Sequence, residues 1–93
     1  MIHVAVHEKR REIRYPADGP VRVRFADPQP AEIEGQLMDV SPSGFRMSHA
    51  NQSLQAGQMV EFTHPHAVGE ARVMWNRILD QRVETGFLIV PAK

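Results

Sequence analysis

Two short groups of side chains in this 93-residue chain have the types and spacing to bind an anion or a nucleobase. Residues 10–14 read Arg-Arg-Glu-Ile-Arg, an RxxxR spacing, and residues 39–44 read Asp-Val-Ser-Pro-Ser-Gly, a DxSxxG spacing. The planar fork of arginine donates two parallel hydrogen bonds to a phosphate or to O6 and N7 of guanine, whereas lysine offers a point charge. A carboxylate accepts hydrogen bonds from the N1–H and amino groups on the other edge of guanine.

Taken separately, each group also has an ordinary structural explanation. An RxxxR spacing is common in solvated basic loops. A DxSxxG spacing is typical of an Asx or Ser turn that a left-handed glycine closes. The two groups occur in this order, 25 residues apart, in one short chain that is rich in predicted strands. This combination favours a ligand site over two unrelated loops.

The elements that must position these groups are short strands, because apolar residues alternate with polar ones along most of the chain. The pattern Val21, Val23, Phe25 is the clearest example, and Asp27-Pro28-Gln29-Pro30 then breaks it. In the fifth run, Trp75 is expected on the same face as Ala71 and Val73, with Met74 on the opposite face. The predicted strands are 21–25, 33–40, 45–48, 60–62, 71–75 and 87–89.

Strands of this number and spacing, joined by Gly- and Pro-containing turns, indicate one all-β domain, a small antiparallel barrel or sandwich. Residues 49–57 are expected to form a loop with room for one helical turn. We expect residues 1–19 to form a flexible basic N-terminal arm and residues 20–91 to form the β-barrel. Whether residues 1–6, with Ile2, Val4 and Val6 alternating, form an edge strand stays open.

The sequence resembles the PilZ domain family of bacterial cyclic-di-GMP receptors over nearly its whole length. The resemblance is carried by RxxxR, by DVSPSGFRM at 39–47, by LQAGQ at 54–58, and by ARVMW at 71–75 with ETGF at 84–87. It implies a six-stranded antiparallel β-barrel whose N-terminal arm folds over the ligand on the barrel surface. The chain ends at Lys93 without the trailing helix that some members carry, so docking and oligomer geometry stay open.

The resemblance implies that the ligand-binding residues are Arg10, Arg11, Arg14, Asp39, Ser41 and Gly44. Arg11 is either a phosphate contact or simply solvated, and Gly44 is expected to let the turn adopt a positive φ. Possible ligand-adjacent residues are Lys9, Arg46 and Trp75. In this family the position of Lys9 influences whether one ligand or an intercalated pair is bound. Arg46 is expected to point outward, either beside the site or as a plain surface charge. The position of Trp75 at the end of an alternating strand favours packing in the core or at the barrel rim over stacking on a ligand.

Composition excludes several other classes of protein. Eleven Lys+Arg balance eleven Asp+Glu, so a general DNA or RNA binder is not expected. There is no cysteine, and His64 and His66 lack further converging ligands nearby in sequence, so we expect no metal and interpret the histidines as surface or turn residues. No apolar run is long enough to cross a bilayer, so no membrane insertion and a cytoplasmic location are expected. No nucleophile elbow accompanies Ser41, so the chain is not expected to be an enzyme or to need a cofactor.

The resemblance implies a cyclic-di-GMP-binding signalling receptor or adaptor whose N-terminal arm changes conformation on binding. With no output domain in 93 residues, it would act on an unidentified protein effector that controls motility, pili or exopolysaccharide, as a monomer or weak homodimer. The alternative is a ligand-independent adaptor of the same fold, which would have no reason to keep both motifs. A single-stranded nucleic-acid binder is disfavoured by zero net charge and six aromatic residues.

Overall fold

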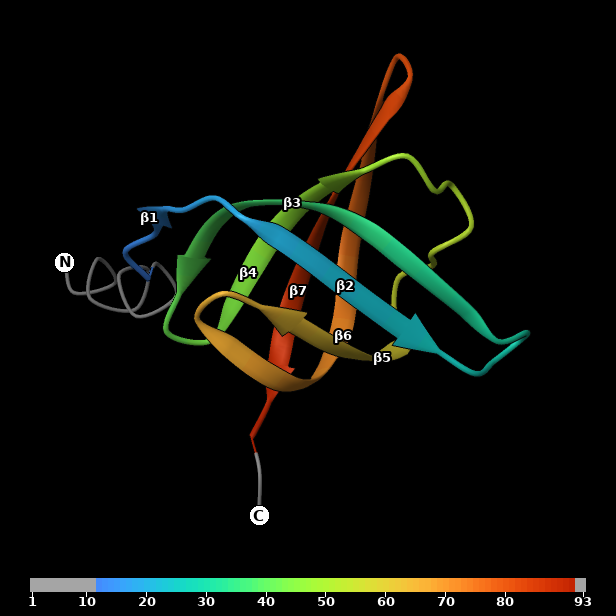
Figure 1. The fold of residues 1–93 in the computed structure, drawn as a ribbon, viewed down its shortest axis with the longest axis horizontal. Coiled ribbons are helices and arrows are strands. Elements are labelled where there is room, and N and C mark those ends of the chain that lie inside the picture. Colours follow the sequence, from blue (N-terminus) through green and yellow to red (C-terminus); the bar gives the residue numbers. More distant parts are fainter. Residues whose placement is uncertain (1–11, 92–93) are drawn as a thin grey trace, which may run out of the picture.

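The computed structural model describes residues 12–91, which fold into seven β-strands and contain no helix (Figure 1). Most of the predicted N-terminal arm, including Lys9, Arg10 and Arg11, and the possible edge strand at 1–6 lie outside the described residues. The strands are β1 (Tyr15–Pro16), β2 (Pro20–Phe25), β3 (Ala31–Ser41), β4 (Gly44–His49), β5 (Met59–His64), β6 (Ala67–Leu79) and β7 (Arg82–Val90).

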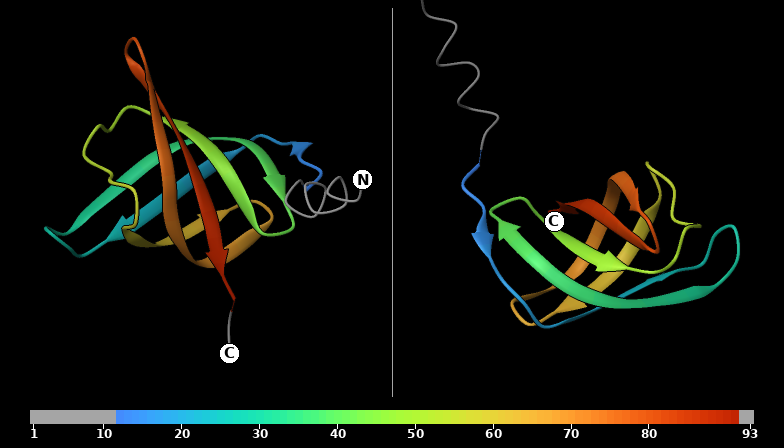
Figure 2. Two further views of the ribbon diagram at one scale, coloured as in Figure 1. Left: turned by 180° about the vertical axis from the view of Figure 1, so that it is seen from behind. Right: turned by 90° about the horizontal axis from the view of Figure 1, so that it is seen from above.

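Six of these strands close into an antiparallel barrel, as the resemblance implied. Their order around the barrel is β3-β2-β5-β6-β7-β4, and β4 pairs back onto β3 to complete the ring. The two-residue strand β1 lies on the same edge of β3 as β2, further along, with Tyr15 opposite Val40 and Pro16 opposite Asp39. Closure leaves few free strand edges. The pairing of β1 with the end of β3 brings β1 close to the β3–β4 turn (Figure 2).

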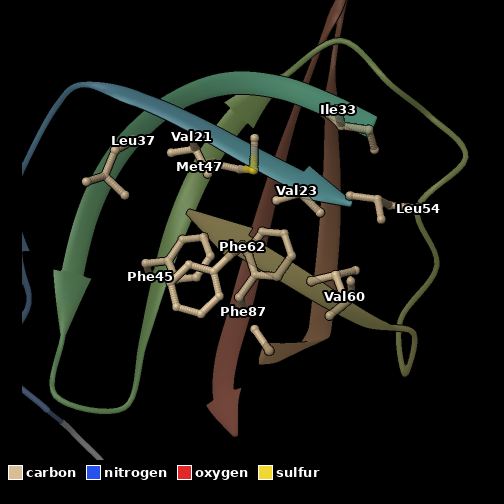
Figure 3. Packing of buried hydrophobic residues seen from close by; sticks show 12 residues of the cluster. Val21, Val23, Ile33, Leu37, Phe45, Met47, Leu54, Val60, Phe62 and Phe87 are labelled. Carbon is tan, nitrogen blue, oxygen red and sulfur yellow. The ribbon is translucent and has the colours of Figure 1, made fainter. Parts of the chain in front are cut away.

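The interior of the barrel is filled by alternate residues of the strands, which confirms the period-2 pattern of the sequence. Phe45 lies at its centre, with ring centroids 4.7 Å from Phe62 and 4.6 Å from Phe87 (Figure 3). Because Phe45 and Met47 are fully buried, the residue between them, Arg46, must point to the outer face. The core therefore fixes the outward direction of the side chains on β4.

Two β-bulges interrupt this alternation, one between Leu37 and Asp39 on β3 and one between Val73 and Trp75 on β6. A bulge adds one residue to a strand and so moves the following side chains to the other face. The expectation that Trp75 shares a face with Ala71 and Val73 is therefore wrong: those two are buried, whereas Trp75 is 38% exposed on the outside. Met74, the extra residue, is also exposed.

Other expectations also change with the structure. The strands β6 and β7 are longer than predicted and form a hairpin whose tip extends beyond the barrel (Figures 1 and 2). The loop after β4 contains no helical turn in the described part of the chain.

Two histidines, His49 and His64, are buried rather than at the surface. His64 lies among the phenylalanine rings of the core, and His49 contacts the hydroxyl of Thr85 at 2.7 Å. No helix between residues 12 and 91 is long and apolar enough to cross a membrane.

Candidate functional site

The candidate site lies on the outer face of four neighbouring strands. The pairing register places Asp39 of β3 opposite Arg46 of β4, Arg46 opposite Gly86 of β7, and Gly86 opposite Trp75 of β6. These four residues therefore form one row across the sheet. Both bulges act on this row, because without them Asp39 and Trp75 would face the core. The row collects an acid, a base and an aromatic ring from residues that are far apart in the sequence.

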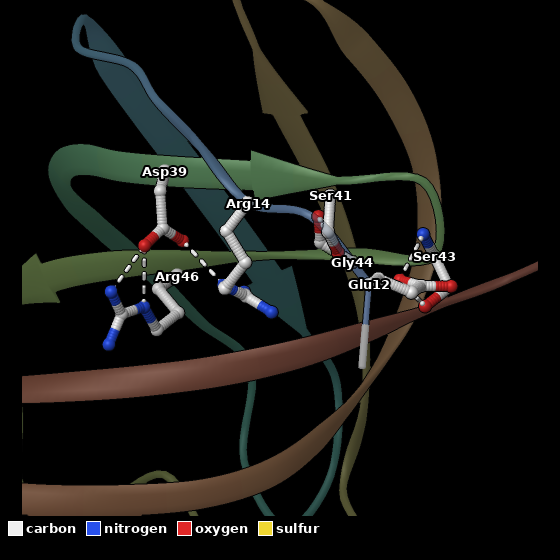
Figure 4. A network of polar contacts seen from close by, with 7 residues as sticks. All are labelled: Glu12, Arg14, Asp39, Ser41, Ser43, Gly44 and Arg46. Carbon is white, nitrogen blue, oxygen red and sulfur yellow. Dashed lines mark hydrogen bonds and ion pairs between the residues drawn. The ribbon is translucent and has the colours of Figure 1, made fainter. Parts of the chain in front are cut away.

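Asp39 is the centre of the polar contacts in this row (Figure 4). Its Oδ1 accepts a hydrogen bond from Nε of Arg14 at 3.1 Å, and its Oδ2 accepts one from Nε of Arg46 at 2.8 Å and a second from Nη2 of Arg46. Asp39 is only 6% exposed, whereas the side chains of Arg14 and Arg46 are 40% and 30% exposed. A buried carboxylate thus holds two arginines whose remaining donors face solvent.

The charge state of this group follows from its contacts. Burial by itself raises the pKa of Asp39, but the hydrogen bonds from Arg46 and Arg14 outweigh it and hold the pKa below its ordinary value. In turn, the hydrogen bond to Asp39 raises the pKa of Arg46, and the nearby charge of Glu84 adds to the increase. Asp39 is therefore ionised at neutral pH and the two arginines are cationic, leaving one net positive charge in this trio.

The turn between β3 and β4 lies next along the same two strands, where Ser41 pairs with Gly44. The expectation that Gly44 adopts a positive φ is wrong, because among the described glycines only Gly19 and Gly57 do. Gly44 is required for a different reason: a Cβ there would collide with the backbone carbonyl oxygen of Phe87 on β7. The glycine thus lets β7 approach the turn closely.

Two residues that the sequence analysis did not assign to the site meet at this turn: Ser43, which belongs to it, and Glu12, which contacts it. Glu12 lies in the middle of the RxxxR group, and its Oε1 accepts hydrogen bonds from N–H of Ser43 at 3.2 Å and from Oγ–H of Ser43 at 2.7 Å. Ser41 Oγ lies 3.4 Å from the carbonyl oxygen of Gly44. The signal for Glu12 in the sequence is a single acidic residue among the three arginines of residues 10–14.

Trp75 completes the row at its β6 end. Its indole lies over Gly86, because a Cβ added to Gly86 would overlap Cε2 and Nε1 of the ring and come within 2.7 Å of Cζ2. Gly86 is thus a third residue of the site that the sequence analysis did not assign, and its lack of a side chain leaves room for the ring. Arg77 and Glu84 form the adjacent row, with Arg77 Nη2 donating to Glu84 Oε1 at 2.7 Å. The outward face beside Asp39 therefore offers an aromatic ring bordered by ion pairs.

The structure brings together Arg14, Asp39, Ser41, Gly44, Arg46 and Trp75 from the predicted set. Lys9, Arg10 and Arg11 lie outside the described residues. The site is an open face rather than a cavity. Two pockets, of about 630 and 280 Å³, border β2, and neither is lined by a residue of the candidate site. Within residues 12–91, no three His, Asp or Glu side chains converge to hold a metal.

The PilZ domain matches residues 8–90, which is nearly the whole chain. The chain belongs to the PilZ domain family. PilZ domains are binding domains rather than enzymes, which agrees with the expectation that this chain is not an enzyme. Comparison with curated proteins gives no match.

A solved structure supports the PilZ fold. The crystal structure of YcgR from Escherichia coli in complex with c-di-GMP superposes with a TM-score of 0.70 at 18% sequence identity. The match covers 91% of this PilZ chain and 39% of the YcgR chain, so the chain spans well under half the length of that protein. At this identity the likeness establishes the barrel fold, and it agrees with the six-stranded closure described above.

Proposed function

We propose that this PilZ domain is a receptor for cyclic-di-GMP, bound on the outer face of β3, β4, β7 and β6. The observation that carries the proposal is the buried, ionised Asp39 between Arg14 and Arg46, two residues before Ser41 on β3. Cyclic-di-GMP has two guanines and two phosphates, so it needs both a carboxylate for the N1–H and amino edge and arginine forks for O6, N7 and phosphate. Both kinds of group are present within this one row.

The charges of the described residues fit such a ligand. The trio of Asp39, Arg14 and Arg46 carries one net positive charge, and the arginine side chains are 40% and 30% exposed. The arginines therefore have free donors for the dianion without having to leave Asp39. Arg10, Arg11 and Lys9 precede Arg14 in the sequence and lie outside the described residues; we propose Arg10 and Arg11 as further ligand contacts, with Lys9 adjacent to the ligand.

Trp75 gives the proposed site a surface for stacking. Trp75 is 38% exposed, and its ring packs directly on Gly86, because Cε2, Nε1 and Cζ2 lie where a Cβ of that residue would be. Aromatic rings stack on purines, and a ring that is already held in place loses less conformational entropy when it does so. We propose that Trp75 borders the bound guanine, in place of the core or rim role that its spacing favoured.

Titration calorimetry of the whole chain with cyclic-di-GMP at two salt concentrations tests the proposal. We expect micromolar or tighter binding that weakens with salt. Asp39→Ala and Arg14→Ala are each expected to weaken binding by about 1–3 kcal/mol if a bidentate contact is lost. The matched control is Arg24→Ala, which removes an exposed arginine that pairs with Glu61 on another part of the barrel. Equal affinities for Arg24→Ala and Arg14→Ala would refute a site on this face.

The output of the receptor is proposed to be a protein effector that controls motility, pili or exopolysaccharide, reached through a change in the N-terminal arm. The competing proposal is a ligand-independent adaptor that works by protein contacts alone. No heat and no change in thermal stability with cyclic-di-GMP would favour the adaptor. A stability shift that follows RT ln(1 + [L]/Kd) would favour the receptor.

A further inference from the structure

The contact between Glu12 and the β3–β4 turn resembles the binding of a free anion. One carboxylate oxygen, Oε1, accepts from both the backbone N–H and the hydroxyl of Ser43, at 3.2 and 2.7 Å. The Ser43 hydroxyl has the largest effect on the pKa of Glu12 and lowers it. Burial, the next largest effect, raises this pKa, but the Ser43 N–H, the Ser41 hydroxyl and the charge of Arg14 lower it further, so the pKa lies below its ordinary value. The immediate partners of this oxygen are therefore neutral donors of one turn.

Neutral donors that converge on one oxygen are the chemistry by which turns bind phosphate. The N–H of Ser43 is available because it lies in the turn, between the last pair of the β3–β4 ladder, Ser41 and Gly44. Its carbonyl is already used by the N–H of Ile89 at 2.8 Å, which fixes the orientation of the turn. The donors are thus preorganised for a negative group, and the Glu12 carboxylate occupies that place in this structure.

The position of this turn relative to Asp39 suggests which anion it would take. Ser41 follows Asp39 by two residues on β3, and Gly44 precedes Arg46 by two on β4. At ~3.4 Å per residue, the turn therefore lies roughly 7 Å from the Asp39–Arg46 pair along the strands. This separation is comparable with that between the edge of a purine and the phosphate of the same nucleotide. A guanine at Asp39 would bring its phosphate to the turn.

We propose that the 41–44 turn is a phosphate subsite of the nucleotide site, with Ser43 as its main donor, and that Glu12 occupies this subsite when no ligand is bound. The inference rests on the proposed function and adds Ser43 and Glu12 to it. Binding then requires the phosphate to displace the carboxylate, so Glu12 is an internal competitor.

With competition of this kind, the apparent affinity equals the intrinsic affinity multiplied by the fraction of molecules in which the turn is free. Two hydrogen bonds hold the carboxylate, and they are exposed to solvent, so their combined effect is modest. We expect Glu12→Ala to tighten cyclic-di-GMP binding by about 3- to 20-fold, measured by calorimetry in about 0.5 M salt to screen long-range repulsion. Asp18→Asn is the matched control, because it removes a carboxylate from the same N-terminal segment and is expected to change affinity less than about 2-fold.

A second variant tests the subsite itself. In the Glu12→Ala background, Ser43→Ala removes a phosphate donor without relieving any competition, so we expect it to weaken binding by about 3- to 10-fold. Equal affinities of Glu12→Ala and the parent chain would overturn the competition. No loss from Ser43→Ala in that background would overturn the subsite.

The last measurement separates this inference from the proposed function. In Glu12→Ala, inorganic phosphate is titrated while the amide resonance of Ser43 is followed by NMR. A saturable shift of this resonance, absent when chloride is used at equal ionic strength, supports the subsite even if cyclic-di-GMP does not bind. Absence of that shift, with cyclic-di-GMP bound normally, would overturn the inference and leave the receptor proposal intact.

Discussion

Replacing Asp39 by asparagine removes the charge that holds Arg14 and Arg46 while keeping the size of the side chain. Asparagine can accept from one arginine, but its amide group then faces the other, so two cations lose a shared partner. Hydrogen bonds to a charged group contribute about 1.5–3 kcal/mol when buried, and exposed ion pairs contribute about 0–1 kcal/mol. Since Asp39 is 6% exposed and its partners are 40% and 30% exposed, we expect a loss between these limits, about 1–2 kcal/mol.

The pH dependence of this loss gives the sharper test. The folded pKa of Asp39 lies below its ordinary value of 3.8, because the hydrogen bonds from the two arginines outweigh burial. A depressed carboxyl pKa contributes stability that is complete above the unfolded pKa and disappears as the pH falls through the folded pKa. The difference between the parent chain and Asp39→Asn is therefore expected to be constant from about pH 5 to 7 and to shrink below about pH 4.

Urea unfolding at pH 7, 5, 4 and 3, followed by the fluorescence of Trp75, measures this difference. The control is Glu61→Gln, because Glu61 also pairs with an arginine, at 3.3 Å, but both side chains are more than half exposed. Glu61→Gln is expected to change stability by less than about 0.5 kcal/mol at every pH. A difference for Asp39→Asn that is equally small at pH 7, or that persists unchanged at pH 3, would refute the reasoning.

Three further predictions concern two glycines of the site and a buried histidine of the core. Gly44→Ala would force apart β4 and the carbonyl of Phe87, so we expect a loss of about 2 kcal/mol or more in chemical unfolding, together with weaker ligand binding. Gly86→Ala is expected to displace the indole of Trp75 and to shift its emission to longer wavelength, whereas an unshifted spectrum would contradict the placement of the ring on this glycine. Burial lowers the pKa of His64, so Tm is expected to fall as the pH drops below about 6.5, and His64→Leu to flatten this dependence.

Much of the fold follows from local patterns in the sequence. Alternating apolar residues such as Val21 and Val23 on β2 and Phe45 and Met47 on β4 identify strands and their buried faces, because the side-chain period of a strand is two. The prolines at 28 and 30 end β2, since each removes a backbone donor. These features depend only on neighbours in the chain, which is why the sequence alone predicts them.

The candidate site is partly predictable for a related reason. RxxxR and DxSxxG identify the chemistry, because arginine, carboxylate and hydroxyl groups have fixed hydrogen-bonding properties. Local sequence patterns do not show which residues those groups contact in the fold. Arg46 pairs with Asp39 across a hairpin, and Glu12 meets Ser43 across 31 residues, so each contact depends on register and strand order.

The sequence by itself determined that this chain is a strand-rich domain with an arginine group and an acidic serine turn, and these features indicated its family. Only the tertiary structure decided where those residues face. A single bulge on β3 and another on β6 move Asp39 and Trp75 from the core side to the outside, and barrel closure sets them in one row with Arg46. Bulges and closure arise from pairing between distant strands, so no local pattern specifies them.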